Sequence, residues 1–91
     1  MAIVEKTLTL VNKVGLHARP ASMFVQTAAR FESTITVASN GRVANAKRML
    51  SVLQLGAEHG ASLTITAEGD DAAVAVEALT GLVENRFGET E

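Results

Sequence analysis

The stretch that decides how this chain is organised is Gly-Leu-His-Ala-Arg-Pro-Ala-Ser, residues 15–22. Just downstream, apolar residues recur with a spacing that predicts an amphipathic helix. They are Ala21, Phe24, Val25, Ala28 and Ala29. Proline is tolerated in the first turn of a helix, where its missing N–H is not needed. The helix is therefore expected to begin within a few residues of Pro20, to reach about Arg30, and to leave His17 at or beside its N-cap.

His17 is expected to lie where an anion is favoured. The first turn of a helix carries free backbone N–H groups and the positive end of the helix dipole, and both attract anions. Arg19 adds a guanidinium whose fork matches phosphate oxygens. Because a neutral imidazole nitrogen is a nucleophile, the combination points to phosphorylation of His17. The alternative is a polar residue that merely lies near a helix start.

Three stretches alternate between apolar and polar residues, as half-buried strands do. They are residues 2–11, 33–39 and the segment that contains Leu63, Ile65 and Ala67. A further strand, the third in chain order, is expected at residues 42–46, directly after the Asn40-Gly41 turn. Lys6 is the one discordant inward position in the first. Asn40-Gly41 is the strongest short hairpin signal, so the second and third strands are expected to pair antiparallel.

Two further helices are expected after the third strand. A short one spans residues 47–55. A longer one follows the turn at residues 69–71, whose aspartates suit a helix N-terminus, and Gly88 is a candidate to end it. The order βαββαβα predicts an α+β fold, a two-layer open-faced sandwich with one bare face on a four-stranded sheet. Residues 1–91 are expected to form a single domain.

The short helix is apolar on more than one side. At about 100° per residue, Val52 and Leu55 share one arc, and Met49, Leu50 and Leu53 share another. A short helix on one sheet buries one such face, so Val52 and Leu55 are expected to point inward. The other three are expected to form an exposed patch, and exposed apolar clusters tend to be docking surfaces. The alternatives are that the core buries both arcs or that an oligomer covers one.

Composition and spacing argue against several other classes of function. The net charge is −2 and the only aromatic residues are three Phe, which argues against a nucleic-acid binder. No apolar run approaches the roughly 20 residues that cross a bilayer, and the first residues lack the features of a signal peptide. The chain has no cysteine, which excludes disulfides and fits a cytoplasmic protein.

The remaining residues give weaker evidence for a catalytic or metal-binding site. His59 is expected to be an exposed loop residue, and no cluster of His, Cys, Asp and Glu has metal-ligand spacing, so neither metal nor cofactor is expected. The pair Asp70-Asp71 is better explained by helix capping than by catalysis. Neither a phosphate-binding P-loop nor a nucleophile elbow occurs in the sequence.

The motif at residues 15–22 resembles the phosphohistidine motif of the HPr family, the small phosphocarriers of the bacterial phosphoenolpyruvate-dependent phosphotransferase system (PTS). Other segments match that family in order and spacing, and the likeness covers essentially the whole chain. These segments are Asn40-Gly41, Asn45-Ala46-Lys47, Leu55-Gly56-Ala57 and Gly60. The resemblance implies an antiparallel four-stranded sheet covered by three helices, the middle one short.

The resemblance implies a role for each residue of the motif. Enzyme I, itself charged from phosphoenolpyruvate, would phosphorylate His17 at Nδ1. His17 would then pass the group to the A domain of a sugar-specific PTS transport component. Arg19 would neutralise the phosphate, and Pro20 would help to fix the helix start.

The resemblance also implies that Met49, Leu50 and Leu53 form the apolar anchor against which both partners dock. Lys47 and Arg48 flank this patch and are candidates to steer acidic partner surfaces. The alternative for these two residues is that they are plain solvated charges.

One position departs from a pattern within the family. In many Gram-positive relatives a serine directly after the Asn-x-Lys segment is phosphorylated by a regulatory kinase. Arg48 stands there in this chain, so that switch is expected to be absent. Ser51 is expected to be a solvated helix serine rather than a substitute.

Together these observations predict a histidine phosphocarrier, not an enzyme, that acts as a cytoplasmic monomer. A close alternative is the nitrogen-related branch of the same family, which relays phosphate to regulatory proteins and which the motif does not separate from the sugar branch. An alternative of another class is an interaction module that uses the patch of Met49, Leu50 and Leu53 without phosphotransfer. A small enzyme with His17 as general base is a third, but the chain shows no second catalytic group.

Overall fold

The predicted order of strands and helices is confirmed. The computed structural model describes residues 2–89. Its elements are β1 (Ala2–Thr9), α1 (Ala18–Ala28), β2 (Thr34–Ser39), β3 (Arg42–Asn45), α2 (Met49–Leu53), β4 (Ser62–Gly69), α3 (Ala72–Glu84) and the 3-10 helix η1 (Arg86–Gly88). None of the helices described has the length and apolar run that crossing a membrane requires.

The four strands form one sheet in the order β1-β4-β2-β3, and every pair of neighbours is antiparallel. β2 and β3 make the predicted hairpin, in which Asn40 and Gly41 have φ of 54° and 75°. β4 lies between β1 and β2, so Thr9 pairs with Ser62. The end of β1 and the start of β4 are therefore neighbours, although they are far apart in the sequence.

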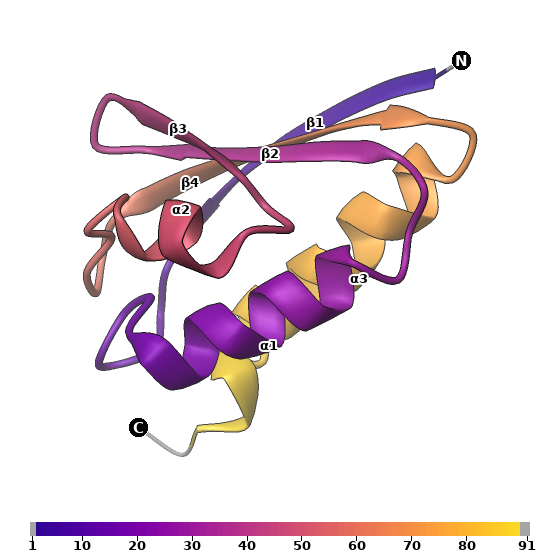
Figure 1. Cartoon of the computed structure of the whole chain (residues 1–91). Helices are drawn as coiled ribbons and strands as arrows, with labels where there is room; N and C mark the ends of the chain where they lie inside the picture. The colour runs from indigo at the N-terminus through magenta and orange to yellow at the C-terminus, as the bar shows by residue number, and fades with distance from the viewer. Residues whose placement is uncertain (1, 90–91) are drawn as a thin grey trace.

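All the helices cover one face of the sheet and leave the other face bare (Figure 1). The alternating residues of β2 and β4 explain this arrangement, because their apolar members are buried on the helical side: Ile35, Val37, Leu63, Ile65 and Ala67. The bare face carries mainly polar side chains, and the hydroxyls of two of them, Thr7 and Thr64, lie 3.0 Å apart. The exposed apolar side chains of Ile3 and Val43 also lie on this face. The open-faced α+β sandwich is thereby confirmed.

α1 begins where Pro20 predicted and ends two residues earlier than expected. The N–H groups of Arg30 and Phe31 donate to Thr27 and Ala28, three residues back, so the helix tightens and stops. The buried face is also narrower than the spacing suggested, because Val25 is only half-buried and Ala29 is exposed.

The end of α3 differs from the prediction. The helix stops at Glu84, not at Gly88, and Arg86 and Phe87 have positive φ values of 53° and 54°. The side chain of Phe87 is fully buried. Burial of a large aromatic ring is worth more than the cost of a left-handed residue, so the chain turns back before the glycine.

Asp71 does not cap its helix with its side chain, which corrects the capping prediction. It occupies the N-cap position of α3 without a side-chain capping bond. Its carboxylate instead accepts hydrogen bonds from the N–H groups of Glu32 at 2.8 Å and Ser33 at 2.9 Å, and from the Ser33 hydroxyl. The Ser33 hydroxyl and the Glu32 N–H, in that order, lower the pKa of Asp71. Asp71 thus ties the start of α3 to the loop between α1 and β2.

Candidate functional site

His17 occupies the N-cap position of α1, as the spacing predicted. Its backbone is extended, and its side chain makes no capping hydrogen bond. Its carbonyl accepts the first helical bond, from the Ala21 N–H at 2.9 Å. Pro20 is the third residue of the helix and is buried, so its missing N–H falls within the first turn. The imidazole is therefore carried at a helix start without serving as its cap.

Two loops meet beneath His17 and hold its backbone. The Leu16 N–H donates to the Ala57 carbonyl at 2.9 Å, and Leu10 exchanges backbone hydrogen bonds with Gly60 and Ala61. Gly15 has φ of +67°, and a Cβ built on it would lie 2.6 Å from the Ala57 oxygen. Only glycine fits at this position, because both the backbone angle and the space exclude a side chain. The two loops continue the pairing of β1 with β4 beyond the strands.

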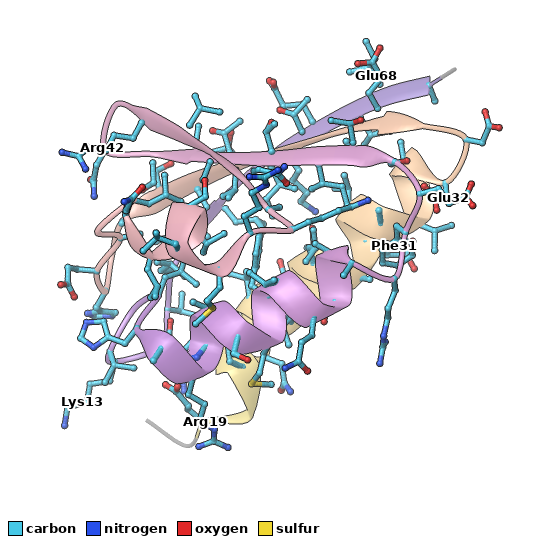
Figure 2. All side chains as sticks on the ribbon, in the orientation of Figure 1. Lys13, Arg19, Phe31, Glu32, Arg42 and Glu68 are labelled. Atoms are coloured by element: carbon cyan, nitrogen blue, oxygen red, sulfur yellow. The ribbon has the colours of Figure 1, made fainter. Side chains whose placement is uncertain are left out.

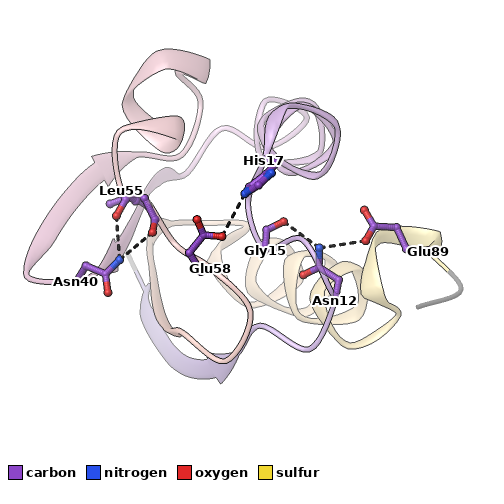
Figure 3. Close-up of polar contacts among 8 residues, drawn as sticks. Asn12, Gly15, His17, Asn40, Leu55, Glu58 and Glu89 are labelled. Carbon is purple, nitrogen blue, oxygen red and sulfur yellow. Dashed lines mark hydrogen bonds and ion pairs between the residues drawn. The ribbon is translucent and has the colours of Figure 1, made fainter.

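Asn12 braces the loop before His17 from within. Its side chain is fully buried, and its Nδ2 donates to the Gly15 carbonyl at 2.9 Å and to Oε1 of Glu89 at 3.2 Å (Figure 3). Its Oδ1 is buried and has no hydrogen-bond partner among the residues described. Asn12 therefore links the loop to the segment that follows η1.

The imidazole of His17 contacts one carboxylate. Nε2 of His17 lies 3.1 Å from Oε2 of Glu58, which projects from the facing loop (Figure 3). The two side chains are 58% and 70% exposed. The ring is consequently open to a large partner, and solvent weakens the pair relative to a buried one.

The surroundings of the helix start favour an anion. The first turn of α1 contains no acidic residue, so its free N–H groups and the positive end of the helix dipole are not neutralised from within. Arg19 lies in that same turn and is exposed, with its guanidinium at the lower edge of Figure 2. The local charge can therefore receive a phosphoryl group.

The opposite end of α1 has the reverse character. A shallow hollow there is lined by four acidic residues, of which Glu32 and Glu68 lie at the right-hand end of Figure 2: Glu32, Glu68, Asp70 and Asp71. Phosphate would be repelled from that end. Within residues 2–89, no group of three or more His, Cys, Asp and Glu is arranged to hold a metal ion.

The short helix divides its apolar residues between the core and the surface. Val52 and Leu55 are buried, as predicted. Leu50 is 68% exposed, whereas Met49 and Leu53 are half-buried and pack against the core. The patch formed by these three residues therefore has one prominent side chain flanked by two that are partly covered.

The charges beside the patch have different environments. Arg48 is exposed and makes no capping bond at the N-cap of α2. Nζ of Lys47 donates to the Phe31 carbonyl at 2.6 Å, so this ammonium group has an internal partner. Of the two predicted steering residues, only Arg48 projects freely from the surface.

Two further residues can be compared with their predictions. Ser51 is half-buried, and its hydroxyl accepts a hydrogen bond from the Asn45 N–H at 3.1 Å. The hydroxyl therefore joins α2 to β3, a contact that the prediction of a solvated helix serine did not include. His59 is exposed, as expected.

Sequence reasoning assigned no role to Glu58 or Asn12. Glu58 is separated from His17 by 41 positions, and no local motif marks it. The only signal that could have found it is the register of β1 and β4, which places the two loops side by side. Asn12 lies between Val11 and the charged Lys13, and nothing in this local sequence marks it as buried, because its partners are set by the fold.

Comparison with known proteins agrees with this geometry. A family model described as "PTS HPr component phosphorylation site" matches residues 4–85. The phosphocarrier protein HPr of Xylella fastidiosa strain Temecula1 is 41% identical over 87 residues, which cover 96% of this chain and 98% of that protein.

Solved structures lead to the same family. The crystal structure of HPr from Thermoanaerobacter tengcongensis has a TM-score of 0.93 and 44% identity, and the match covers 97% of this chain and 99% of that one. A second structure from that organism, described as an HPr dimer, has a TM-score of 0.77 and 45% identity over 90% of this chain and 94% of that one. The chain therefore belongs to the HPr family, the phosphocarrier proteins of the phosphotransferase system.

Proposed function

We propose that Nδ1 of His17 accepts a phosphoryl group from Enzyme I and passes it to the A domain of a sugar-specific PTS transport component. The observation that carries this proposal is an exposed imidazole at the start of a helix whose first turn holds Arg19 and no acidic residue. Pro20 supports it by fixing that helix start.

The transfer needs little machinery in this chain. The Nδ1 lone pair attacks phosphorus, the N–P bond forms, and the bond between phosphorus and its donor atom breaks, while the donor keeps that electron pair. Phosphoryl transfer depends chiefly on in-line positioning and charge stabilisation, which the partners also supply. A carrier must release the group again, so one exposed arginine and a helix start form a site of suitable, moderate strength. On this proposal the chain is a carrier and not an enzyme.

The patch of Met49, Leu50 and Leu53 is the proposed docking anchor for both partners. It adjoins α1, with which α2 is in contact, and Leu50 supplies most of its exposed apolar surface. Exposed Arg48 would steer acidic partner surfaces. Lys47 contributes mainly to the fold, because its ammonium group is bonded to Phe31.

The remaining parts of the proposal concern the state of the protein. We expect residues 1–91 to act as one domain and as a monomer in the cytoplasm, with no need for metal, cofactor, nucleic acid or membrane insertion. The dimer of the Thermoanaerobacter relative makes the oligomeric state a direct question for sedimentation analysis.

The first experiment is intact-mass spectrometry after incubation with phosphoenolpyruvate, Mg²⁺ and Enzyme I from the same organism. One added phosphoryl group that is acid-labile and absent from His17→Ala is expected. Failure of the wild-type protein to gain the group would sink the carrier function and favour a non-phosphorylated interaction module.

A second experiment separates the two branches of the family. The phosphorylated protein is mixed in turn with a sugar-branch A domain and a nitrogen-branch A domain, and the initial rate of phosphate loss is measured. Faster discharge to the sugar-branch domain is expected. The reverse preference would assign the chain to the nitrogen-related branch.

The docking patch is tested with two exposed apolar residues. Leu50→Ala is expected to raise the KM for phosphorylation by Enzyme I about tenfold, since truncation of an interface anchor often costs more than 1 kcal/mol. Val43, which is 73% exposed on β3, is the control, and Val43→Ala should leave the KM unchanged. Equal KM values for the two variants would show that the patch of Met49, Leu50 and Leu53 is not the docking anchor.

A further inference from the structure

The contact between His17 and Glu58 determines which nitrogen of a neutral ring carries the proton. An ionised carboxylate only accepts hydrogen bonds. Oε2 of Glu58 lies 3.1 Å from Nε2 of His17, so Nε2 must donate its proton in this contact. In a neutral imidazole the other nitrogen, Nδ1, then holds the lone pair.

The contact is built on a fixed backbone, although both side chains are exposed. The Leu16 N–H donates to the Ala57 carbonyl at 2.9 Å, and these residues directly precede His17 and Glu58. Gly15 packs so closely that a Cβ on it would lie 2.7 Å from the Glu58 Cα. The two side chains therefore start from neighbouring backbone positions that this hydrogen bond and this packing hold close together.

We propose that Glu58 is a positioning residue that selects Nδ1 of His17 as the phosphorylated nitrogen. The inference rests on the proposed function and extends it to a residue outside the motif. Two effects act in the same direction. The hydrogen bond holds the proton on Nε2, which removes that nitrogen as a nucleophile, and the carboxylate charge repels a phosphoryl group approaching from that side.

NMR of the protein alone measures the first effect, the retention of the proton on Nε2. The ring nitrogens of ¹⁵N-labelled His17 are recorded at pH 9, where a histidine ring is neutral, and their shifts report the tautomer ratio. Glu58→Ala should lower the ratio of the Nε2–H to the Nδ1–H form about threefold, the effect of one exposed hydrogen bond. Glu58→Lys, which places a donor beside Nε2, should shift it further in the same direction.

Chemical phosphorylation measures the second effect. Phosphoramidate, a small donor that needs no Enzyme I, is added to each protein in a His59→Gln background, because the exposed His59 would otherwise react as well. In that background ³¹P NMR gives the ratio of the two phosphohistidine isomers on His17. Nδ1 should dominate in the wild type, and the share of the Nε2 isomer should rise in Glu58→Ala and more in Glu58→Lys. Glu77→Lys, an equal charge change at an exposed position on α3, should match the wild type.

The outcomes separate this inference from the proposed function. An unchanged tautomer ratio in both Glu58 variants would overturn it, as would an isomer ratio that stays constant while the tautomer ratio moves. If Glu77→Lys changed the isomer ratio as much as Glu58→Lys does, the effect of Glu58 would be one of net charge alone, and this result would overturn the inference as well. Failure of Enzyme I to label the protein would sink the carrier function and leave these two readouts intact.

Discussion

Two loop junctions, one at each end of α1, are built in the same way but differ in function. Each consists of two loops, a glycine and a carboxylate. At the His17 junction, residues 12–17 meet residues 57–61, and the Glu58 carboxylate faces one imidazole nitrogen. At the Asp71 junction, residues 31–33 meet residues 69–71, and one carboxylate accepts three hydrogen bonds from Glu32 and Ser33. Both junctions are closed by a glycine that has no room for a Cβ.

The two junctions differ in the number of hydrogen bonds that the carboxylate makes. Asp71 accepts three hydrogen bonds from Glu32 and Ser33, which tie the start of α3 to the loop after α1. Glu58 makes a single contact in an exposed place, and one side of the histidine ring stays open. The comparison shows that a stable backbone junction can hold a weakly bonded side chain in place, which suits a group that must meet partners in turn.

The largest expected effect tests the backbone of the His17 junction. Gly15→Ala should lower the free energy of unfolding by about 3 kcal/mol, because it adds a clash with the Ala57 carbonyl to the cost of a left-handed residue. Gly56, with φ of +62° and no atom near its absent Cβ, is the control, and Gly56→Ala should cost about 1 kcal/mol. Urea denaturation measures both, and equal losses would show that the junction is not tightly packed.

The next prediction concerns the buried brace of the same junction. Asn12→Ala should cost about 2 kcal/mol, because it removes two hydrogen bonds from a fully buried side chain. Gln26→Ala, an exposed change on α1, should alter stability by less than about 0.5 kcal/mol. A loss for Asn12→Ala as small as that of the control would mean that Asn12 does not brace the loop.

The Asp71 junction should show its contribution through pH. Its hydrogen bonds hold the pKa of Asp71 below the ordinary value of 3.8, so the folded protein favours the ionised form. The stabilisation is complete above pH 3.8 and is lost as the pH falls through the lowered pKa. Asp71→Asn should lower the melting temperature at neutral pH. It should also make the decline of the melting temperature below pH 3.8 shallower than in the wild type.

The neighbouring carboxylate is the control for that measurement. Asp70→Asn makes the same charge change at an exposed position and should leave both the melting temperature and its acid profile close to the wild type. If the two variants behaved alike, the hydrogen bonds that Asp71 accepts from Ser33 and Glu32 would not be the source of the stabilisation.

The smallest expected effect on stability belongs to Glu58. Glu58→Gln should change the free energy of unfolding by less than about 0.5 kcal/mol, since exposed pairs contribute little. Thermal unfolding checks this, and a loss as large as that of Asn12→Ala would show that Glu58 is a structural brace. The contrast between the two junctions depends on this residue being dispensable for folding.

Local rules account for much of what could be predicted. Pro20 and the apolar spacing after it placed the start of α1 and the N-cap position of His17, because both depend on residues within one or two turns. Asn40-Gly41 identified the hairpin for the same reason. Gly88 misled the prediction, because the burial of Phe87, a tertiary effect, ended the helix earlier.

The sequence by itself determined the element order, the helix start directly after His17 and the inward direction of Val52 and Leu55 on the short helix. These follow from periodicity and backbone preferences, which act over a few residues. Only the tertiary structure decided that β4 lies beside β1, that Glu58 faces His17, and that Asp71 binds Ser33. The two side-chain contacts join residues 41 and 38 positions apart, and the partners in β1 and β4 are still further apart in the sequence. All of them depend on which strands pair and which faces are buried together.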